Sequence, residues 1–158
     1  MTIINGVDMP NFSPGEFSED PNKYAHPDLL KYAQLYRTLL RAKIFPSKAD
    51  GALARTSGKI TSMHFVSNGS LSWAWDIFCN THIFKAWTVA LSCGLWSGVG
   101  VYFDTDGNNG EHWPMLHLDL RIKALIWYRD DGEYFYPHTS KSFYYDLQTL
   151  LMLHGKGK

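Results

Sequence analysis

The chain has 158 residues, a length typical of one domain that buries most of its apolar surface without disulfide bonds. Lysine plus arginine equals aspartate plus glutamate at 15 each, so there is no basic field of the kind that binds nucleic acid. Hydrophobic residues make up 45% and aromatic residues 15%, which excludes a disordered chain and indicates a single domain over residues 1–158.

The first 26 residues predict an extended, loop-rich arm, because four prolines and glycines precede Ser18 and the polar stretch EDPNKYAH follows it. The opening MTIINGVDMPNF lacks a basic segment followed by an apolar one. No secretory signal peptide is therefore expected, and the protein is expected to be made in the cytoplasm. The richest apolar run, IFKAWTVALSCGLW, contains a lysine and is too short to cross a bilayer, so no membrane partner is expected.

The segment HPDLLKYAQLYRTLLRAK predicts a helix. Its entry carries proline and aspartate, and its last turn carries arginine and lysine, as helix ends prefer. Its apolar residues recur at helical spacing: Leu29, Ala33, Tyr36 and Leu40. Pro46 and Gly51 then interrupt the chain, so a short strand followed by a loop is expected over residues 44–55.

The stretch WAWDIF alternates in the period of a strand, which predicts Trp73, Trp75 and Ile77 on one face and Ala74 and Asp76 on the other. The next apolar segment predicts a helix that Asn80 or Thr81 caps and that ends at Cys93 before Gly94. The two cysteines, Cys79 and Cys93, lack a CxxC spacing and are expected to be buried free thiols.

The C-terminal half predicts mostly strands. SGVGVYFD is typical of a strand, TDGNNGEHWP of a long turn and MLHLDLR of an alternating strand, while LIWYR, DDG and EYFY indicate a hairpin. Ser140 or Ser142 can cap a last helix that ends at Gly155, followed by a tail over residues 155–158. This order of elements predicts an α+β domain in which helices flank a central antiparallel sheet.

Three polar residues from separate segments suggest a metal site. In MLHLDLR, His117 and Asp119 point to one face of the strand, opposite a stripe of leucines, and must be solvated, paired or liganded. Together with His64 and Asp76, His117 completes a His, Asp, His set, which is the ligand complement of a catalytic zinc site with one position open to water. Alternatively, each is a hydrogen-bonded polar group at a strand end.

A series of motifs follows one order along the chain. It comprises NFSPGEF, the helix HPDLLKYAQLYRTLL, IFPSKADGALAR, a Ser-x-His at 62–64, an Ala-x-Asp-Ile at 74–77 and GVGVYFDTDGNNGEHWPMLHLDLR. This order resembles the zinc peptidases of the D-Ala-D-Ala carboxypeptidase and L-alanyl-D-glutamate endopeptidase group. Those bacterial and phage enzymes cut peptidoglycan stem peptides and share a fold with the hedgehog signalling domain. The likeness is collinear from about Phe12 to Trp127.

The resemblance implies a hedgehog/DD-peptidase-like fold and a Zn²⁺ cofactor held by His64, Asp76 and His117. His64 and Asp76 are separated by five more residues than the H-x(6)-D spacing of most of the group, so we interpret FVSNGSLSW as a loop insertion that preserves both ligands. Many relatives place an acid three residues before the last ligand, where this chain has Pro114. The proton-transfer residue and the activity itself are therefore open.

Candidate catalytic residues flank the ligands. For the general base we rank His112 first and Glu111 second, against the alternative that GNNGEH is a solvated turn. Arg55 is the candidate for polarising the scissile carbonyl or gripping a substrate carboxylate, and otherwise is a surface charge. Ser62, Asp119 and Trp113 are candidate substrate contacts; Asp119 can equally support a ligand or pair with Arg121 or Arg55.

The leading hypothesis is a phage-type peptidase, an endolysin or virion-associated enzyme whose partner is a peptidoglycan peptide. Such an enzyme reaches the bacterial cell wall after release through a holin or as part of a virion. The bond cut is D-Ala-D-Ala or L-Ala-D-Glu. One alternative is a phage structural protein that keeps the peptidase fold with weak or no activity, which the missing acid favours. Another is a bacterial carboxypeptidase that acts on soluble dipeptides in the cytosol.

Overall fold

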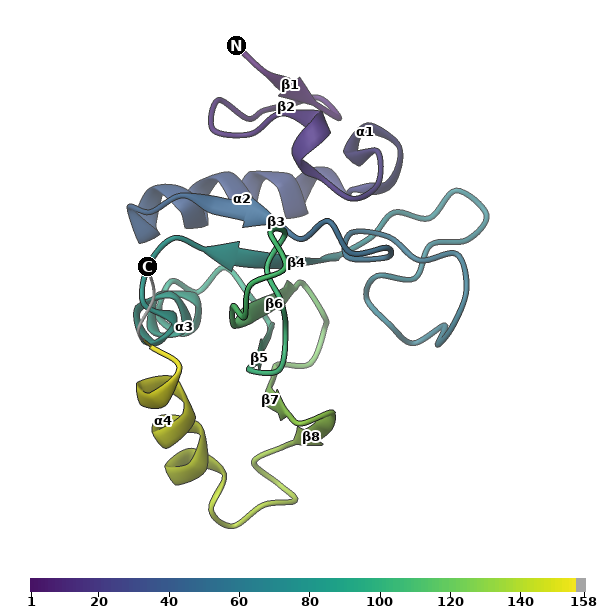
Figure 1. Ribbon diagram of the computed structural model, residues 1–158. Coiled ribbons are helices and arrows are strands. Elements are labelled where there is room, and N and C mark those ends of the chain that lie inside the picture. The colour runs from purple at the N-terminus through teal and green to yellow at the C-terminus, as the bar shows by residue number, and fades with distance from the viewer. Residues whose placement is uncertain (156–158) are drawn as a thin grey trace.

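A six-stranded sheet organises the chain, of which the computed structural model describes residues 1–155 (Figure 1). In spatial order its strands are β3 (Ile44–Pro46), β4 (Ala74–Cys79), β6 (Met115–Asp119), β5 (Gly98–Tyr102), β7 (Leu125–Asp130) and β8 (Glu133–Phe135). This α+β arrangement confirms the predicted fold class at that level. All neighbouring strands run antiparallel except β5 and β7, which pair in parallel.

The expectation of an antiparallel sheet is therefore wrong, and the sheet is mixed. The reason lies in the edges of β6, because β4 covers one edge and β5 covers the other. When the chain leaves β6 through residues 120–124, β7 cannot pair with β6 and adds to the outer edge of β5 instead. Since β5 already runs antiparallel to β6, the returning β7 runs parallel to β5.

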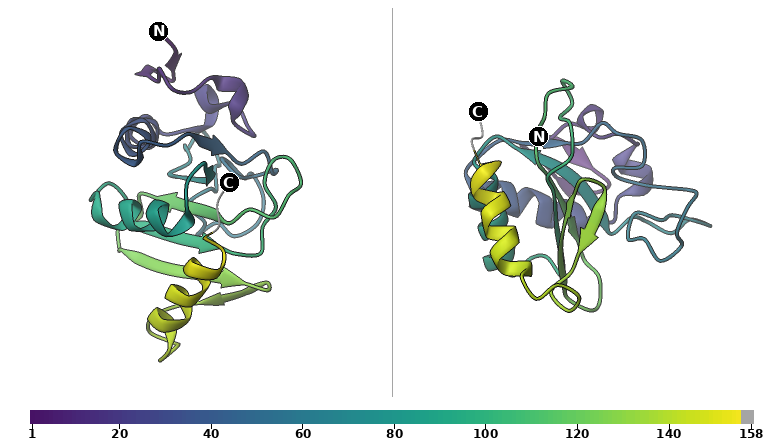
Figure 2. Two further views of the ribbon diagram at one scale, coloured as in Figure 1. Left: turned by 60° about the vertical axis from the view of Figure 1, so that its left-hand side comes forward. Right: turned by 60° about the horizontal axis from the view of Figure 1, so that its bottom comes forward.

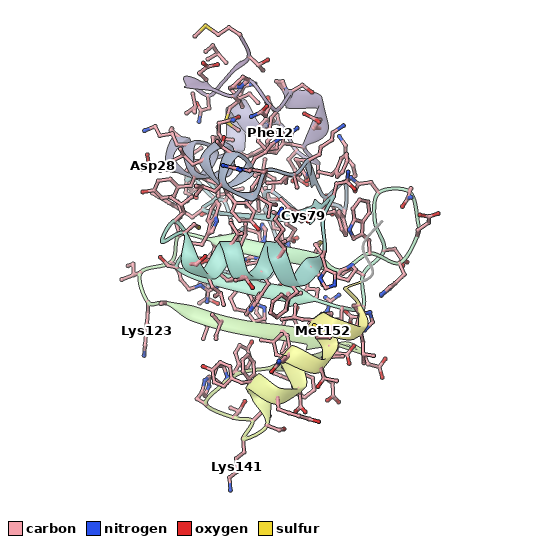
Figure 3. All side chains as sticks on the ribbon, turned by 90° about the vertical axis from the view of Figure 1, so that its left-hand side faces the viewer. Phe12, Asp28, Cys79, Lys123, Lys141 and Met152 are labelled. Atoms are coloured by element: carbon pink, nitrogen blue, oxygen red, sulfur yellow. The ribbon has the colours of Figure 1, made fainter. Side chains whose placement is uncertain are left out.

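The two faces of the sheet differ in what covers them. One face packs against α2 (Pro27–Leu40), α3 (Ile83–Ser92) and α4 (Phe143–Leu153), with core residues such as Leu116 and Leu118 fully buried. Figure 3 shows this helical face, with α3 in front of the strands and Met152 marking α4. The opposite face lies toward the long loop between β3 and β4 (Figure 2, right). None of the described helices is long and apolar enough to span a membrane.

The N-terminal segment contains more structure than the expected arm. It forms the two short strands β1 (Ile3–Ile4) and β2 (Val7–Asp8), the 3-10 helix η1 (Pro14–Glu16) and the short helix α1 (Pro21–Tyr24). It lies beside α2 at the top of Figure 1. Phe12 and Phe17 are buried and pack against Trp75 of β4, with ring centroids 5.8 and 6.4 Å apart. The segment therefore belongs to the main core.

Most predicted elements are confirmed, and the differences lie at their ends. The helix over residues 27–40 and the β7–β8 hairpin are present, and the hairpin turns through Asp131 and Gly132, both with positive φ. His82, and neither Asn80 nor Thr81, caps α3 by accepting a hydrogen bond from the backbone N–H of Phe84 at 3.2 Å.

The last helix begins after Ser142, one of the two predicted caps, and ends at Leu153, before the expected Gly155. Of the predicted tail, residues 156–158 lie outside the described residues.

The two cysteines are free, as expected. Cys79 is buried and Cys93 is half-buried. Burial raises the pKa of the Cys79 thiol to about 12, so this thiol stays protonated and unreactive at neutral pH.

The two tryptophans that flank Ala74 have opposite environments. Trp75 is buried at 1% exposure, as predicted, whereas Trp73 is 37% exposed and stacks on His26 with 3.5 Å between ring centroids. The prediction that Trp73 faces the core is wrong, because β4 begins only at Ala74. The backbone N–H of Trp73 instead bonds the carbonyl of Met63 in the long loop.

This difference predicts unequal costs for the same substitution. Trp75→Ala should lower the free energy of unfolding by about 3–5 kcal/mol, because it opens a cavity in the core. Trp73→Ala should cost only about 1 kcal/mol, the magnitude of one aromatic stacking contact. Urea titrations followed by circular dichroism compare the two variants. Equal losses would contradict the assignment of these side chains to core and surface.

Candidate metal centre

Strand register brings two of the predicted ligands together on the face opposite the helices. Asp76 of β4 and His117 of β6 are cross-strand partners, and Gly100 of β5 lies opposite His117 on its other side. The third residue, His64, comes from the loop over residues 47–73. Backbone hydrogen bonds hold His64 in place, since Arg55 N–H donates to its carbonyl at 2.8 Å and Val66 N–H donates to that of Arg55, also at 2.8 Å.

The three side chains meet at one buried point. His64 Nε2 lies 3.0 Å from His117 Nδ1 and 3.4 Å from Asp76 Oδ1, and His117 Nδ1 lies 2.9 Å from Asp76 Oδ1. Donor atoms about 2.0–2.2 Å from a tetrahedral zinc ion are roughly 3.3 Å from one another. The observed triangle is close to that size, and all three residues are buried. These residues can therefore hold a metal ion, as the spacing predicted.

Each imidazole has an outer nitrogen, which points away from the meeting point, and an inner nitrogen, which faces it. The hydrogen-bond partner of the outer nitrogen determines which nitrogen carries the hydrogen. His64 Nδ1 lies 3.3 Å from the carbonyl oxygen of Leu53, and His117 Nε2 lies 2.8 Å from Asp119 Oδ2. Both partners are acceptors, so each outer nitrogen carries the hydrogen in the neutral ring. The inner nitrogens then present lone pairs beside the Asp76 carboxylate. Three facing acceptors are unfavourable unless a proton or a cation lies among them.

The pKa shifts of Asp76 and His117 agree with this geometry. Burial alone would raise the pKa of the Asp76 carboxyl, but the charge of His64 and hydrogen bonds from both histidines hold that pKa well below its ordinary value. Burial would also lower the pKa of His117, but hydrogen bonds to Asp119 and Asp76 outweigh it and raise the pKa to about 9. Without metal, a proton therefore occupies His117 Nδ1, and a bound cation would replace this proton.

Asp119 supports His117 from behind. It is fully buried, does not line the cleft, and accepts hydrogen bonds from His117 Nε2 and, at 2.9 Å, from Arg121 Nε. Of the roles left open for it, the structure therefore favours orienting a ligand and pairing with Arg121 over contacting a substrate. A carboxylate that fixes the ring of a ligating histidine is a common feature of metal sites.

Two glycines of β5 make room for this support. A Cβ added to Gly98 would lie 2.1 Å from Asp119 Oδ1, and one added to Gly100 would lie 2.4 Å from the ring of Trp127. Trp127 in turn packs against His117, with 5.0 Å between ring centroids. The Gly-x-Gly pattern therefore allows the groups that orient His117 to lie directly over the sheet backbone.

Glu19 of the N-terminal segment supports the loop beside His64. Its carboxylate accepts hydrogen bonds from the backbone N–H groups of Gly51, Leu53 and Ala54 at 2.7, 2.9 and 3.0 Å. The carbonyl of Leu53 is the acceptor near His64 Nδ1. Glu19 thus holds the backbone that sets the orientation of the His64 ring, a role that the sequence did not suggest.

A cleft of about 540 Å³ opens at the three ligands. Besides the three candidate ligands, two predicted residues line it, Arg55 and Ser62. The Arg55 side chain is 47% exposed, with Nη2 3.9 Å from Asp76 Oδ2 and Nε donating to the Gly51 carbonyl at 3.0 Å. Ser62 Oγ accepts a hydrogen bond from the backbone N–H of His64 at 3.3 Å. Both residues therefore lie beside the centre.

The structure does not bring the three predicted residues of the β5–β6 loop to the cleft. His112 is exposed, with Nε2 3.1 Å from His154 Nδ1, and Glu111 accepts a hydrogen bond from Asn109 Nδ2 at 2.9 Å. Trp113 packs against Phe45 and Phe78. The loop closes on itself through the bridge between Asp106 and His112, which turns these side chains away. His112 and Glu111 therefore lie outside the lining of the cleft.

Tyr102 is a cleft residue that the sequence-based assignment missed. It lines the cleft at the end of β5, and its ring lies 6.4 Å from that of His117. Burial and then the negative charge of Asp76 raise the pKa of its hydroxyl well above the ordinary value. The alternation of GVGVY placed Gly98, Gly100 and Tyr102 on one face, and that pattern could have identified it.

Comparisons with known proteins give this chain no relatives. No family model, curated protein or solved structure matches it. The assignment of the metal ligands therefore rests on the distances, burial and hydrogen bonds of the described residues.

The crowding at Gly98 predicts that one methyl group will weaken metal binding. Gly98→Ala should displace the Asp119 carboxylate from His117 and reduce Zn²⁺ affinity roughly 10- to 100-fold, the usual effect of losing such a support. Gly15→Ala is the matched control, because an added Cβ there meets no atom within 4 Å. Competition with a chelator of known affinity measures both. Unchanged affinity in Gly98→Ala would contradict the supporting role of Asp119.

Proposed function

We propose that the protein is a zinc peptidase that cuts peptidoglycan stem peptides. The observation that carries this proposal is the convergence of two imidazole nitrogens and one carboxylate oxygen at the floor of an open cleft. Three such ligands suit a catalytic zinc site, which keeps one position for water. The collinear motifs of the D-Ala-D-Ala carboxypeptidase and L-alanyl-D-glutamate endopeptidase group, with their hedgehog/DD-peptidase fold, provide the substrate class.

His64, Asp76 and His117 would hold the zinc ion. When bound, zinc supplies a Lewis acid and lowers the pKa of a coordinated water toward neutrality. The chain's own contribution is to turn the inner nitrogen of each imidazole toward the ion. Leu53 and Asp119 do this by accepting the outer hydrogens of the two rings.

Arg55 supports recognition of an anionic or polarised group. Of the three arginines that line the cleft, Arg121 pairs with Asp119 and Arg129 pairs with Asp104 at 2.8 Å. The nearest carboxylate to Arg55 is that of the ligand Asp76, at 3.9 Å, and the guanidinium is half exposed. It can therefore bind the scissile carbonyl or a carboxylate of the stem peptide in two-point contact. This suits either a D-Ala-D-Ala or an L-Ala-D-Glu bond.

In this proposal, the Tyr102 hydroxyl stabilises the transition state by donating a hydrogen bond. Because its pKa is raised, the hydroxyl keeps its proton at neutral pH and can donate a hydrogen bond. A donor aimed at the oxygen that gains charge during peptide hydrolysis is among the largest single contributions to catalysis. Its place in the cleft wall beside His117 and Asp76 fits this role better than the positions of His112 and Glu111 fit that of a general base.

The biological setting we propose is a phage-type enzyme that acts on the bacterial cell wall, after release through a holin or as part of a virion. A second candidate function is a virion or other structural protein that keeps the peptidase fold and a metal without turnover. One observation favours this second candidate. The loop that was expected to supply the base turns His112 toward His154 instead of the cleft.

The ligand assignment predicts that zinc and activity are lost together. His64→Ala and Asp76→Ala should each lower bound zinc from one equivalent to a small fraction, and abolish release of new amino termini from purified cell walls. His138→Ala, an exposed histidine distant in sequence from the ligands, serves as the control. Wild-type protein without stoichiometric zinc would overturn the metal assignment. Stoichiometric zinc without released termini would instead support the structural candidate.

The proposed hydrogen bond from Tyr102 predicts a separate loss of turnover. Tyr102→Phe should reduce kcat about 100-fold or more, the usual effect of removing one oxyanion donor, and leave bound zinc unchanged. Tyr128→Phe is the matched control, because Tyr128 is on the neighbouring strand and faces the helical core. Steady-state kinetics and metal analysis of both variants provide the test. A Tyr102→Phe enzyme with wild-type kcat would exclude this role.

A further inference from the structure

Two histidines outside the cleft meet across separate elements. His112 lies in the β5–β6 loop, and His154 directly follows Leu153, the last residue of α4. Their facing nitrogens, His112 Nε2 and His154 Nδ1, are 3.1 Å apart. This contact places the C-terminal end of α4 beside the loop. The proposed peptidase function uses neither side chain.

The His112–His154 pair has nearly the same nitrogen–nitrogen separation as the two histidines of the centre formed by His64, Asp76 and His117, here called the principal centre. There, His64 Nε2 and His117 Nδ1 are 3.0 Å apart. Both separations are close to the roughly 3.3 Å between two donors of one tetrahedral ion. The ring of Phe103 packs against His154 with 5.2 Å between centroids, which restricts that imidazole, while His112 is exposed and can be reached from solvent.

We propose that His112 and His154 form a second metal-binding site, for a divalent transition-metal ion that prefers imidazole, such as Zn²⁺, Ni²⁺ or Cu²⁺. Among the described residues, no third histidine, cysteine or carboxylate completes a set of three around the pair, so water fills the remaining positions. The site is therefore weaker than the principal centre. It is also independent of the proposed peptidase function, because none of its atoms belongs to the cleft.

A metal at this pair would cross-link the cleft rim to the last helix. The loop that carries His112 also carries Thr105 and Asp106, which line the cleft. Asp106 is the bridge partner of His112, and Thr105 Oγ1 donates to the carbonyl of Trp113 at 2.7 Å. An ion held by His112 and His154 therefore restrains this wall of the cleft against α4.

The test isolates the pair from the principal centre. In a background that carries both His64→Ala and Asp76→Asn, so that only one donor of the principal centre remains, Zn²⁺ titration by calorimetry after chelator treatment should retain one weak binding event. Adding His154→Ala or His112→Ala should weaken this event at least roughly tenfold, since loss of even a supporting group costs that much. Adding His138→Ala should leave it unchanged. If this double variant does not fold, wild-type protein preloaded with one equivalent of Zn²⁺ replaces it.

Thermal unfolding provides a second readout. Excess Zn²⁺ should raise the Tm of the His64→Ala/Asp76→Asn protein, because an ion that binds only the folded chain stabilises it, and the rise should disappear with His154→Ala. Equal Zn²⁺ affinity with and without the pair would overturn the proposal. A His154→Ala protein with a lower Tm in chelator but unchanged Zn²⁺ binding would also overturn the proposal. That result would mean that the two histidines only form a stabilising hydrogen bond.

Discussion

The buried contact between Asp76 and His117 is the constraint on which the rest of the site depends. Both residues lie in the middle of the sheet and are 5% exposed, so neither can turn to water. A carboxylate and an imidazole in that environment need partners on every side. The neighbouring groups supply them: Asp119 behind His117, His64 in front, and the guanidinium of Arg55 at the rim.

The two faces of the sheet differ in chemical character. Along β4, β5 and β6 the same alternation places apolar side chains against the helices. The other face carries the polar residues and glycines of the site, beside a smaller apolar cluster that includes Phe78 and Met115. A side chain at Gly98 would overlap with Asp119, and one at Gly100 would overlap with Trp127. The packing of the core and the geometry of the metal centre are thus two consequences of one register, and a one-residue slip would destroy both.

Local sequence patterns were sufficient for the parts of the fold that local physics decides. The helix over residues 27–40, the β7–β8 turn and the alternating strand that carries His117 follow from periodicity and turn chemistry. The three candidate metal ligands came from the ordered motifs that resemble the zinc peptidase group, and the structure brings them together. The parallel pairing of β5 and β7 depends on which strand edges remain unpaired in the sheet. A short stretch of sequence does not contain that information. The direction of His112 depends on a loop that bonds to itself, and the contact of Glu19 with Leu53 joins segments 34 residues apart.

The loop over residues 47–73 positions the candidate ligand His64 through hydrogen bonds of its own backbone. A free loop of this length would place an imidazole too loosely for a metal. Here Arg55 pairs its backbone with His64 on one side, and Glu19 binds three N–H groups of the adjoining turn on the other. The ring then has one acceptor, the Leu53 carbonyl, for its outer nitrogen. Part of the precision at His64 thus comes from the N-terminal segment, which Phe12 and Phe17 anchor in the core.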